Sequence, residues 1–382
     1  MAETQFSVPQ GDFDLIRYPP TRDQNLRAWD AADELLLAHV ADVMTEGPFR
    51  SVVTVNDGFG ALSVAVRAAG KADPQNKVSF VSDSHVASIA IRQNLDRNGL
   101  APLDADDVCD PDLVLIKIPK TLGLLEFQLS ELRASLRPTT VVVAGGMTRD
   151  IHASTIDLFE RIIGPSRTSH AKKKARLIFS ELDPELSPVA PQPTVFPLGL
   201  QDVQLVNYPG IFSAKRLDNG TRLLLENLPL TSGSPDVIDL GCGNGALGVA
   251  IALANPNAHV TFVDESHLAA RSAEETFNGA FSALDGAGAP RAKFRVGDCL
   301  DGLHGDSADL IVCNPPFHQG RVQIDDVAWK MFTGAKRVLR PGGELFVVGN
   351  RHLEYFDKLQ RAFGNSQIMA SNSGFVVVRA VA

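Results

Sequence analysis

The stretch that decides the fold is DVIDLGCGNGALGVAIALA, residues 236–254. It begins with the short apolar run Asp236–Leu240, which predicts a buried strand. A glycine-rich turn at Gly241–Gly245 follows, and the apolar, helix-forming run Ala246–Ala254 comes directly after it. A strand, a glycine-rich turn and a helix in this order are typical of the opening of a ligand-binding βαβ unit. The stretch therefore predicts an α/β domain with a doubly wound, mostly parallel sheet.

The same alternation of strands and helices continues to residue 382. We expect a helix near Val327–Val338 and a closing hairpin that adds one antiparallel strand. The predicted strands are His259–Val263, Phe294–Val296, Asp309–Cys313 and Glu344–Val348, and the hairpin consists of Gln367–Ala370 and Phe375–Ala380.

The first half of the chain repeats this pattern in the same order, which predicts a duplicated fold. Three pairs of segments match: Val52–Val66 with Val237–Ile251, Val78–His85 with Val260–His267, and Asp112–Ile116 with Asp309–Cys313. The sequence therefore predicts two tandem Rossmann-like α/β domains.

The two copies differ at their polar positions. Thr54 stands opposite Asp239, Ser82 opposite Asp264, and Lys117 opposite Asn314. We expect the first copy to be degenerate: it folds, but it binds no nucleotide-like cofactor at the equivalent place.

A proline-rich stretch, DPELSPVAPQPTVFPLG at 183–199, separates the copies. Its prolines cannot donate hydrogen bonds to a helix or a sheet, so we interpret it as a linker. The predicted organisation is a degenerate domain at 1–183, a linker at 184–199 and a catalytic domain at 200–382.

Composition excludes several classes of protein. Of the 382 residues, 44% are hydrophobic and 21% are charged, which argues against a disordered chain, a collagen or a coiled coil. No apolar run approaches the roughly 18 residues of a membrane helix, and no secretory signal opens the sequence. The four cysteines form no CxxC pair. We therefore expect no metal site and a location in the reducing cytoplasm.

Three acidic residues at successive strand ends predict the cofactor. Asp239 precedes the Gly241-x-Gly243-x-Gly245 turn, where it would repel a pyrophosphate but suit a cationic amino end, such as that of S-adenosylmethionine. Asp264 ends the next strand and can accept hydrogen bonds from ribose hydroxyls. Asp298 follows the third strand and can accept one from an adenine amine. Because these strand ends meet in one crevice, we expect the three side chains to bind one ligand.

The motif Asn314-Pro315-Pro316-Phe317 ends the fourth strand and predicts the reaction. The Asn314 amide oxygen and the Pro315 carbonyl can each accept a hydrogen bond from one planar NH₂ group. That grip would aim the nitrogen lone pair at a methyl donor, while Pro316 stiffens the turn and Phe317 stacks on the target ring. No strong base is needed, because the nitrogen becomes acidic once it is methylated.

These motifs resemble class I S-adenosylmethionine-dependent methyltransferases that act on exocyclic or amide NH₂ groups. The duplicated chain is similar to the bacterial ribosomal RNA guanine-N2 methyltransferases, which join a degenerate methyltransferase-like domain to an active one. Segments in both halves resemble the large-subunit member of that family: AWDAADELLL (28–37), NDGFGALS (56–63), IKIPKTLGLLE (116–126), RDIHAST (149–155), KKARLI (173–178), FHQ (317–319), VAWKMF (327–332) and NRHLEYFDKL (350–359).

The resemblance implies transfer of a methyl group from S-adenosylmethionine to the N2 of a specific guanine in 23S ribosomal RNA. It also implies that the segment before the second domain, with Phe212, Asp218 and Gly220, lines the cofactor pocket. The full set of expected cofactor residues is Phe212, Asp218, Gly220, Asp239, Gly241, Cys242, Gly243, Asn244, Gly245, Asp264, Glu265, Asp298, Cys299 and Asn314.

With a net charge of −9, any contact with RNA must use a local basic patch. We expect the first domain to be an RNA-docking platform, although a solvated charged face would look the same in the sequence. The candidate contacts are Lys117, Lys120, Arg167, Lys172, Lys173, Lys174 and Arg176. The expected partner is large-subunit ribosomal RNA, bound by a monomer whose halves form an internal pseudo-dimer.

Other functions stay open at this point. The chain could methylate small-subunit ribosomal RNA, a protein glutamine or a DNA adenine, since these enzymes use similar turns. It could also be a non-catalytic RNA-binding assembly factor, although the intact second copy argues against that.

Overall fold

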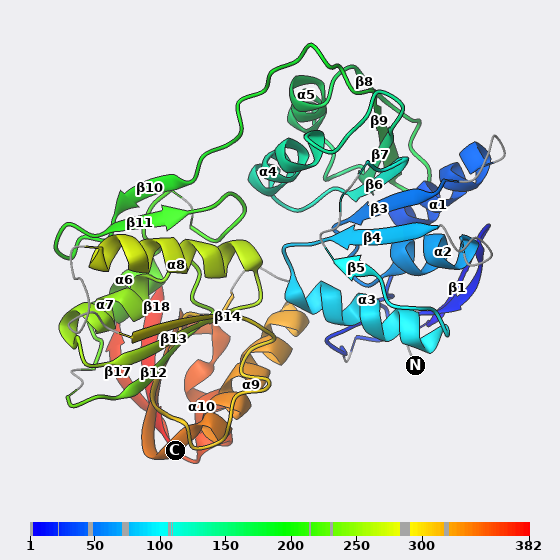
Figure 1. Cartoon of the computed structure of the whole chain (residues 1–382). Coiled ribbons are helices and arrows are strands. Elements are labelled where there is room, and N and C mark those ends of the chain that lie inside the picture. Colours follow the sequence, from blue (N-terminus) through cyan, green and yellow to red (C-terminus); the bar gives the residue numbers. More distant parts are fainter. Residues whose placement is uncertain are drawn as a thin grey trace. The chain divides into compact units, whose positions relative to one another are not determined.

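The structure is a computed structural model in which the chain forms two compact units, Met1–Pro191 and Gln192–Ala382 (Figure 1). It describes residues 3–21, 23–44, 49–70, 76–105, 108, 110–213, 215–229, 232–282, 291–316 and 321–382; of residues 44 and 321–325 it describes the backbone alone. Each unit is built on a seven-stranded sheet.

The first sheet has the strand order β5-β4-β3-β6-β7-β9-β8. Its central strands are parallel, and β9 pairs with β7 in the antiparallel direction. The strands are β3 (Ser51–Val55), β4 (Lys77–Val81), β5 (Asp104–Ala105), β6 (Leu113–Lys117), β7 (Val141–Met147), β8 (Ser166–Thr168) and β9 (Ala175–Ser180). A separate hairpin consists of β1 (Gln5–Val8) and β2 (Gly11–Asp14).

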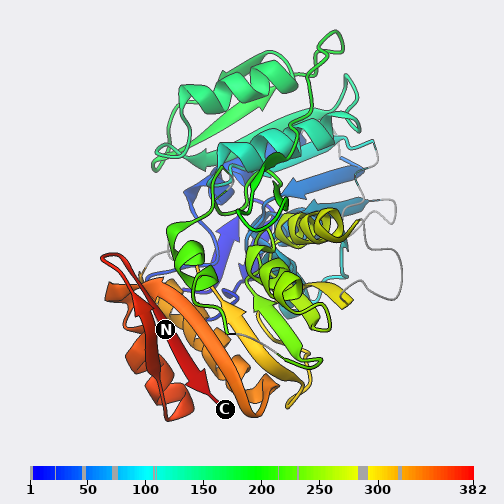
Figure 2. The ribbon, with the colours of Figure 1, turned by 90° about the vertical axis from the view of Figure 1, so that its left-hand side faces the viewer.

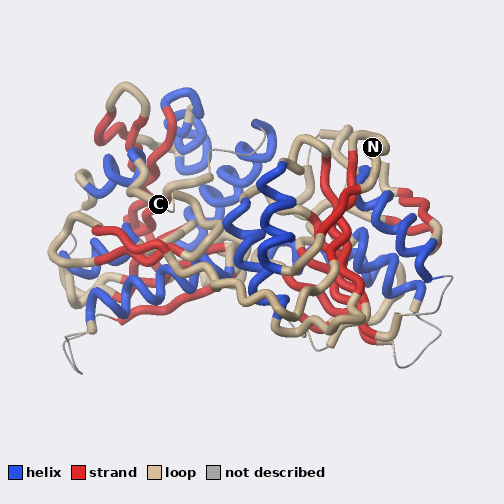
Figure 3. Tube along the Cα trace, turned by 90° about the horizontal axis from the view of Figure 1, so that it is seen from above, coloured by secondary structure: helices blue, strands red, loops and turns tan. Residues whose placement is uncertain are grey.

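Helices cover both faces of this sheet (Figure 3). The core on one face joins the sheet to α1 (Ala31–Met44), α2 (Ala61–Ala69) and α3 (His85–Arg97). The core on the other face joins it to α4 (Leu122–Arg133) and α5 (Ala153–Ile162). Strands covered on both faces must be apolar throughout, which explains the continuous runs in β3 and β6.

The second sheet has the equivalent order, β14-β13-β12-β15-β16-β18-β17, with β18 antiparallel to β16. Figure 2 shows β16, β18 and β17, in orange to red, side by side at one edge. The strands are β12 (Asp236–Leu240), β13 (His259–Asp264), β14 (Arg291–Val296), β15 (Ala308–Cys313), β16 (Leu339–Asn350), β17 (Gln367–Ser371) and β18 (Phe375–Val381).

One face of the second sheet packs against α6 (Asn219–Leu225), α7 (Ala246–Ala254) and α8 (His267–Phe281). The other packs against α9 (Arg321–Val338) and α10 (Tyr355–Phe363), and the short 3₁₀ helix η1 (Arg351–Leu353) follows β16. The prediction of two tandem Rossmann-like domains with mostly parallel sheets and a closing hairpin is thus confirmed.

The proline-rich stretch at 184–199, which we interpret as a linker, contains a short strand. Thr194–Pro197 forms β10, which pairs with β11 (Gln204–Asn207) in the second unit. Pro197 is tolerated there because it ends a strand in a two-stranded ribbon, where it has only one neighbouring strand. Among the described residues, no helix is long and apolar enough to cross a membrane.

Candidate functional site

The glycine-rich turn after β12 forms the floor of the candidate site. Gly241, Gly243 and Gly245 have φ angles of 71°, 54° and 80°, which side-chain-bearing residues rarely adopt. A Cβ atom on Gly245 would lie 3.1 Å from the Ala273 Cα, whereas one on Gly243 would meet nothing within 4 Å. The turn therefore packs tightly on its helix side and is open on the other, where a ligand can approach the backbone.

Asp239 lies beneath this turn with only 1% of its surface exposed. Its Oδ2 accepts a 2.8 Å hydrogen bond from the Gly248 backbone N–H, while its Oδ1 is buried without a hydrogen-bond partner among the described residues. Burial raises the pKa of Asp239 to about 8; the nearby Asp264 charge adds to this effect, and the Gly248 N–H opposes it. A buried carboxylate with an idle oxygen fits a cationic ligand group.

Gly248 is a residue that the sequence reasoning missed. A Cβ there would lie 2.3 Å from the Phe262 ring and 3.1 Å from Asp239 Oδ2. The glycine is needed so that α7 can approach both groups, and the only sequence signal was its place one turn into the helix.

Asp264 and Asp298 end β13 and follow β14, as predicted, but both already have protein partners. Asp264 accepts hydrogen bonds from the Gly243 N–H at 2.9 Å and the Ser266 N–H at 3.0 Å. Asp298 is 5% exposed, and its Oδ2 lies 2.6 Å from the Lys330 ammonium, an ion pair that the sequence did not indicate. Asp264 thereby stabilises the glycine-rich turn itself.

Asn314 follows β15, beside the end of β12. Its Nδ2 donates to the Thr221 hydroxyl at 2.8 Å and to Asp218 Oδ2 at 3.2 Å, while its Oδ1 is buried without a partner in the described part of the chain. Pro315 is buried and Pro316 is exposed. Phe317 lies outside the described residues. Asn314 Oδ1, the oxygen that we predict to accept a hydrogen bond from an amine, is therefore the atom of this amide without a partner in the described structure.

The other candidate cofactor residues are placed around this turn with different exposures. Cys242 is buried and Cys299 half-buried, and burial raises the pKa of both thiols. Asn244 Nδ2 donates to Asn207 of β11 at 2.9 Å. Gly220 is buried in α6, whereas Glu265 and Phe212 are exposed, Phe212 by 49%. Among the described residues, no group of three or more His, Cys, Asp or Glu could hold a metal ion.

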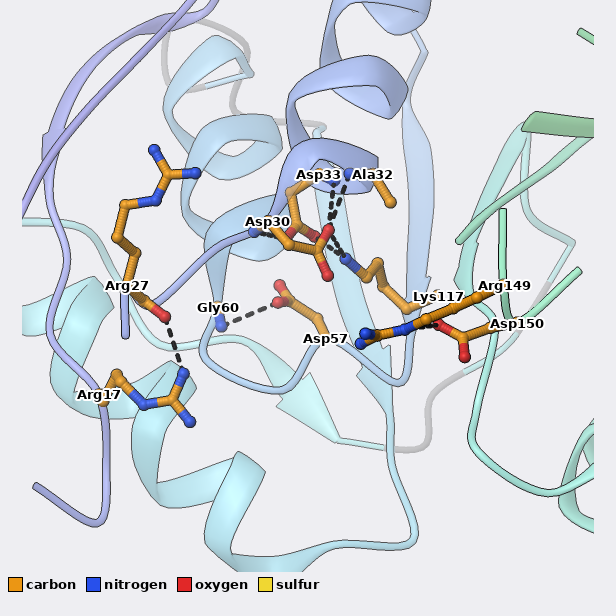
Figure 4. A network of polar contacts seen from close by, with 10 residues as sticks. All are labelled: Arg17, Arg27, Asp30, Ala32, Asp33, Asp57, Gly60, Lys117, Arg149 and Asp150. Atoms are coloured by element: carbon orange, nitrogen blue, oxygen red, sulfur yellow. Dashed lines mark hydrogen bonds and ion pairs between the residues drawn. The ribbon is translucent and has the colours of Figure 1, made fainter. Parts of the chain in front are cut away.

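The equivalent strand ends of the first unit carry a network of polar contacts among the unit's own side chains (Figure 4). The Lys117 ammonium lies 2.7 Å from Asp30 Oδ1 and 2.9 Å from Asp33 Oδ1, both at the start of α1. Burial disfavours the charged ammonium, but Asp33 and Asp30 outweigh it and raise the pKa of Lys117. Burial raises the pKa of Asp33 to about 6, with Lys117 opposing the shift.

Lys117, which we predict to contact RNA, already has two partners within the domain. Its side chain is 15% exposed and forms ion pairs with both carboxylates, so it is less available to a phosphate than the exposed lysines are. Lys120, Arg167, Lys172 and Lys174 are exposed, as a docking surface requires. Lys173 is exposed but pairs with Glu34 at 2.7 Å, and Arg176 is half-buried.

Two family models match the chain over most of its length. Residues 3–184 match the RLMG N-terminal domain, and residues 202–379 match the methyltransferase small domain. Among solved structures, a 16S rRNA N2 methyltransferase (RsmC) of T. thermophilus in complex with AdoMet and guanosine shares the fold, with a TM-score of 0.73 and 22% identity over 99% of this chain and 97% of that one.

Curated relatives match at much higher identity. Ribosomal RNA large subunit methyltransferase G of Streptomyces coelicolor is 47% identical over 98% of this chain and 99% of its own length. The proteins of the same name from Aeromonas salmonicida and Pseudomonas aeruginosa are 46% and 42% identical, over 96% and 98% of this chain and 96% and 99% of their own lengths. Because the similarity spans both units, the chain belongs to the ribosomal RNA large subunit methyltransferase G family.

Proposed function

We propose that the chain transfers a methyl group from S-adenosylmethionine to the exocyclic N2 of a guanine in large-subunit ribosomal RNA. The observation that carries this proposal is a pair of buried oxygens without partners in the described structure, Asp239 Oδ1 and Asn314 Oδ1. Asp239 lies in β12 and Asn314 directly follows β15, and these two strands are parallel neighbours in one sheet. One oxygen suits the cationic end of the cofactor and the other an NH₂ group of the substrate. Membership in the family supports both assignments.

The residues present fit S-adenosylmethionine. Asp239 would hold its ammonium group, the open side of Gly243 would let the ligand lie against the backbone, and Asp264 would face the ribose hydroxyls. When bound, the cofactor supplies an electrophilic methyl group on a sulfonium. The carboxylate of Asp298 already forms an ion pair with Lys330. An adenine amine would have to share this carboxylate with the Lys330 ammonium.

Asn314 and Pro315 would bind and orient the amine. Each offers an oxygen to one N–H bond, which directs the nitrogen lone pair away from the protein and toward the methyl donor. The buried position of the Asn314 oxygen excludes water, so a hydrogen bond made there is stronger than one in solvent. After methylation the nitrogen is acidic and its extra proton leaves to solvent, so no strong base is required.

The first unit would bind the RNA and not the cofactor, since Lys117 pairs with Asp30 and Asp33 at the strand ends where the second unit would bind its cofactor. The exposed lysines of the turn before β9, Lys172, Lys173 and Lys174, are the best candidates for phosphate contacts. Replacing all three by Gln should reduce the salt dependence of RNA binding by about 2 in log–log slope. Lys336→Gln, at an exposed lysine of α9, is the matched control, and an unchanged slope in the triple variant would contradict the docking role.

We further propose that the protein acts as a monomer in the cytoplasm. Light scattering should then give a mass near the 41.0 kDa of one chain, with and without cofactor. A mass of two chains would contradict this.

The test of the function is methyl transfer from radiolabelled S-adenosylmethionine to bacterial ribosomal RNA that lacks the modification. Small-subunit RNA, protein and genomic DNA are supplied in parallel reactions. We expect label in large-subunit RNA, recovered as N2-methylguanosine. Label in small-subunit RNA, protein or DNA would move the activity to another amine, and cofactor binding without any transfer would favour a non-catalytic factor.

A further inference from the structure

The start of α6 holds the side chain of Asn314. Asp218 is the N-cap of this helix and accepts a 3.0 Å hydrogen bond from the Thr221 N–H through its Oδ2. The same Oδ2 and the Thr221 hydroxyl both accept hydrogen bonds from Asn314 Nδ2. Asp218 and Thr221, which precede Asn314 by 96 and 93 positions, thus meet it at the end of β15.

This contact decides which end of the amide points into the site. An asparagine side chain can rotate by half a turn and exchange its oxygen for its NH₂ group, which would oppose the N–H bonds of an amine. The Thr221 hydroxyl can donate or accept and so tolerates both orientations. The Asp218 carboxylate can only accept, so it fixes the NH₂ end on α6 and leaves Oδ1 open. An anionic acceptor also draws electron density toward the amide oxygen, which strengthens it as an acceptor.

The first unit contains the same three positions with different chemistry. Lys117 is the last residue of β6, and Asn314 directly follows β15. Lys117 contacts Asp30 and Asp33, which lie three residues apart at the start of α1 as Asp218 and Thr221 do in α6. Asp30 also receives hydrogen bonds from the backbone N–H groups of Ala32 and Asp33, as an N-cap does. The start of α1 therefore binds Lys117 as the start of α6 binds Asn314. Of these two residues, only Asn314 has an acceptor oxygen to offer a ligand.

We propose that Asp218 and Thr221 are positioning residues for methyl transfer: Asp218 orients and polarises the Asn314 amide, and Thr221 helps to hold it in place. Asp218 would thus act through Asn314, in contrast to a role in lining the cofactor pocket. The inference rests on the proposed function, since its effect is read as a rate of methylation.

The central variant is Asp218→Asn. It has nearly the same shape and keeps a good N-cap, so α6 should still form, but its side chain no longer forces one orientation of Asn314. We expect kcat to fall by at least about tenfold, while the Kd for S-adenosylmethionine, measured by calorimetry, stays within about twofold.

Thr221→Val and Thr221→Ser form a second test. Valine has the shape of threonine without the hydroxyl and should lower kcat about three- to tenfold, and serine should restore most of the loss. The control is Thr276→Val, which also removes a helical hydroxyl; that of Thr276 is buried in the same unit and accepts a 2.9 Å hydrogen bond from the Val206 N–H. Melting temperatures of all variants would reveal any general destabilisation.

An unchanged kcat in Asp218→Asn would overturn the proposal. If the Kd for the cofactor were raised in that variant while kcat stayed unchanged, Asp218 would instead line the cofactor pocket. A loss in Thr221→Val that serine does not restore, or that Thr276→Val equals, would also overturn the proposal. The proposed function fails separately, when the unmodified protein itself transfers no methyl group to large-subunit RNA.

Discussion

The two units differ in the polar side chains at the ends of their central strands. In the second unit, the crevice at β12 and β15 contains two buried oxygens with no partner among the described residues, Asp239 Oδ1 and Asn314 Oδ1. In the first unit, the equivalent crevice at β3 and β6 contains an ion-pair cluster of Lys117, Asp30 and Asp33. Buried acceptors without a partner favour a ligand, whereas the Lys117, Asp30 and Asp33 side chains already bind one another.

The glycine-rich turns show the same difference on a shared scaffold. Gly60 and Gly245 both cap the following helix with φ near 90° and 80°, and a Cβ on either would lie 3.1 Å from the next helix. Where the second unit has Asp239 and Gly248, the first has Thr54 and Ser63, whose hydroxyls lie 2.8 Å apart and satisfy each other. The two copies share this backbone and differ in the polar side chains that it carries.

The largest expected effect comes from giving the second unit the residue of the first. Asn314→Lys should lower methyl transfer to large-subunit RNA at least about 1,000-fold, or about 4 kcal/mol of transition-state stabilisation, because an ammonium cannot accept a hydrogen bond from an amine. Its pairing with Asp218 should preserve the fold, so the melting temperature is measured alongside the rate. Activity within tenfold of the unmodified protein would break the comparison.

Removing Lys117 tests whether the first crevice is held closed by charge. Lys117→Met should lower the free energy of unfolding of the first unit by about 3–4 kcal/mol at pH 8, because the buried Asp33 and the half-exposed Asp30 then lack their counter-charge. The pKa of Asp33 is raised to about 6, so its ionisation costs stability as the pH rises through that value, and the deficit should shrink at pH 5.

Urea denaturation followed by Trp29 fluorescence, with Trp329 replaced by Phe, measures this stability, since the chain has two tryptophans. Lys120→Met, at an exposed lysine, is the control and should change little. An equal deficit at both pH values would contradict the role of charge.

Asp239→Asn tests the open carboxylate of the second unit. The folded pKa is raised from 3.8 to about 8, so the native carboxyl stabilises the fold below pH 4 and loses that contribution as the pH rises toward 8. The neutral variant should gain about 1–3 kcal/mol in unfolding free energy above pH 8 and almost none at pH 4. Calorimetry should show at least about tenfold weaker binding of S-adenosylmethionine. Stability curves that run parallel across this pH range would argue against a strained carboxylate.

The smallest expected effect concerns Gly248. A methyl group there would lie 2.3 Å from the Phe262 ring, so Gly248→Ala should lower the free energy of unfolding by about 1–2 kcal/mol, although alanine favours helices. Gly279→Ala in α8, where nothing lies within 4 Å of a Cβ, should instead raise it by about 0.5–1 kcal/mol. Thermal unfolding of both variants would decide, and equal shifts would mean that the tight contact carries no cost.

The sequence by itself determined the duplicated α/β fold, the order of the elements and the family. Apolar runs such as Asp236–Leu240, glycine turns and proline motifs act through local geometry, which the chain carries wherever it folds. Asp239 and Asn314 could likewise be singled out, because Asp239 lies just before the glycine-rich turn and Asn314 directly follows a strand. The partial strand within the proline-rich stretch was missed, because pairing of β10 depends on β11, which no local pattern reveals.

Only the tertiary structure decided what the polar side chains do. The sequence does not show that Lys117 has partners. The two carboxylates that pair with it, those of Asp33 and Asp30, lie 84 and 87 positions earlier in the chain, at the start of α1. Thr221 carries no motif, and it matters because α6 brings its hydroxyl within 2.8 Å of Asn314. Hydrogen bonds and ion pairs depend on distances of a few ångströms between residues far apart in the chain, and those distances exist only after both sheets have packed against their helices.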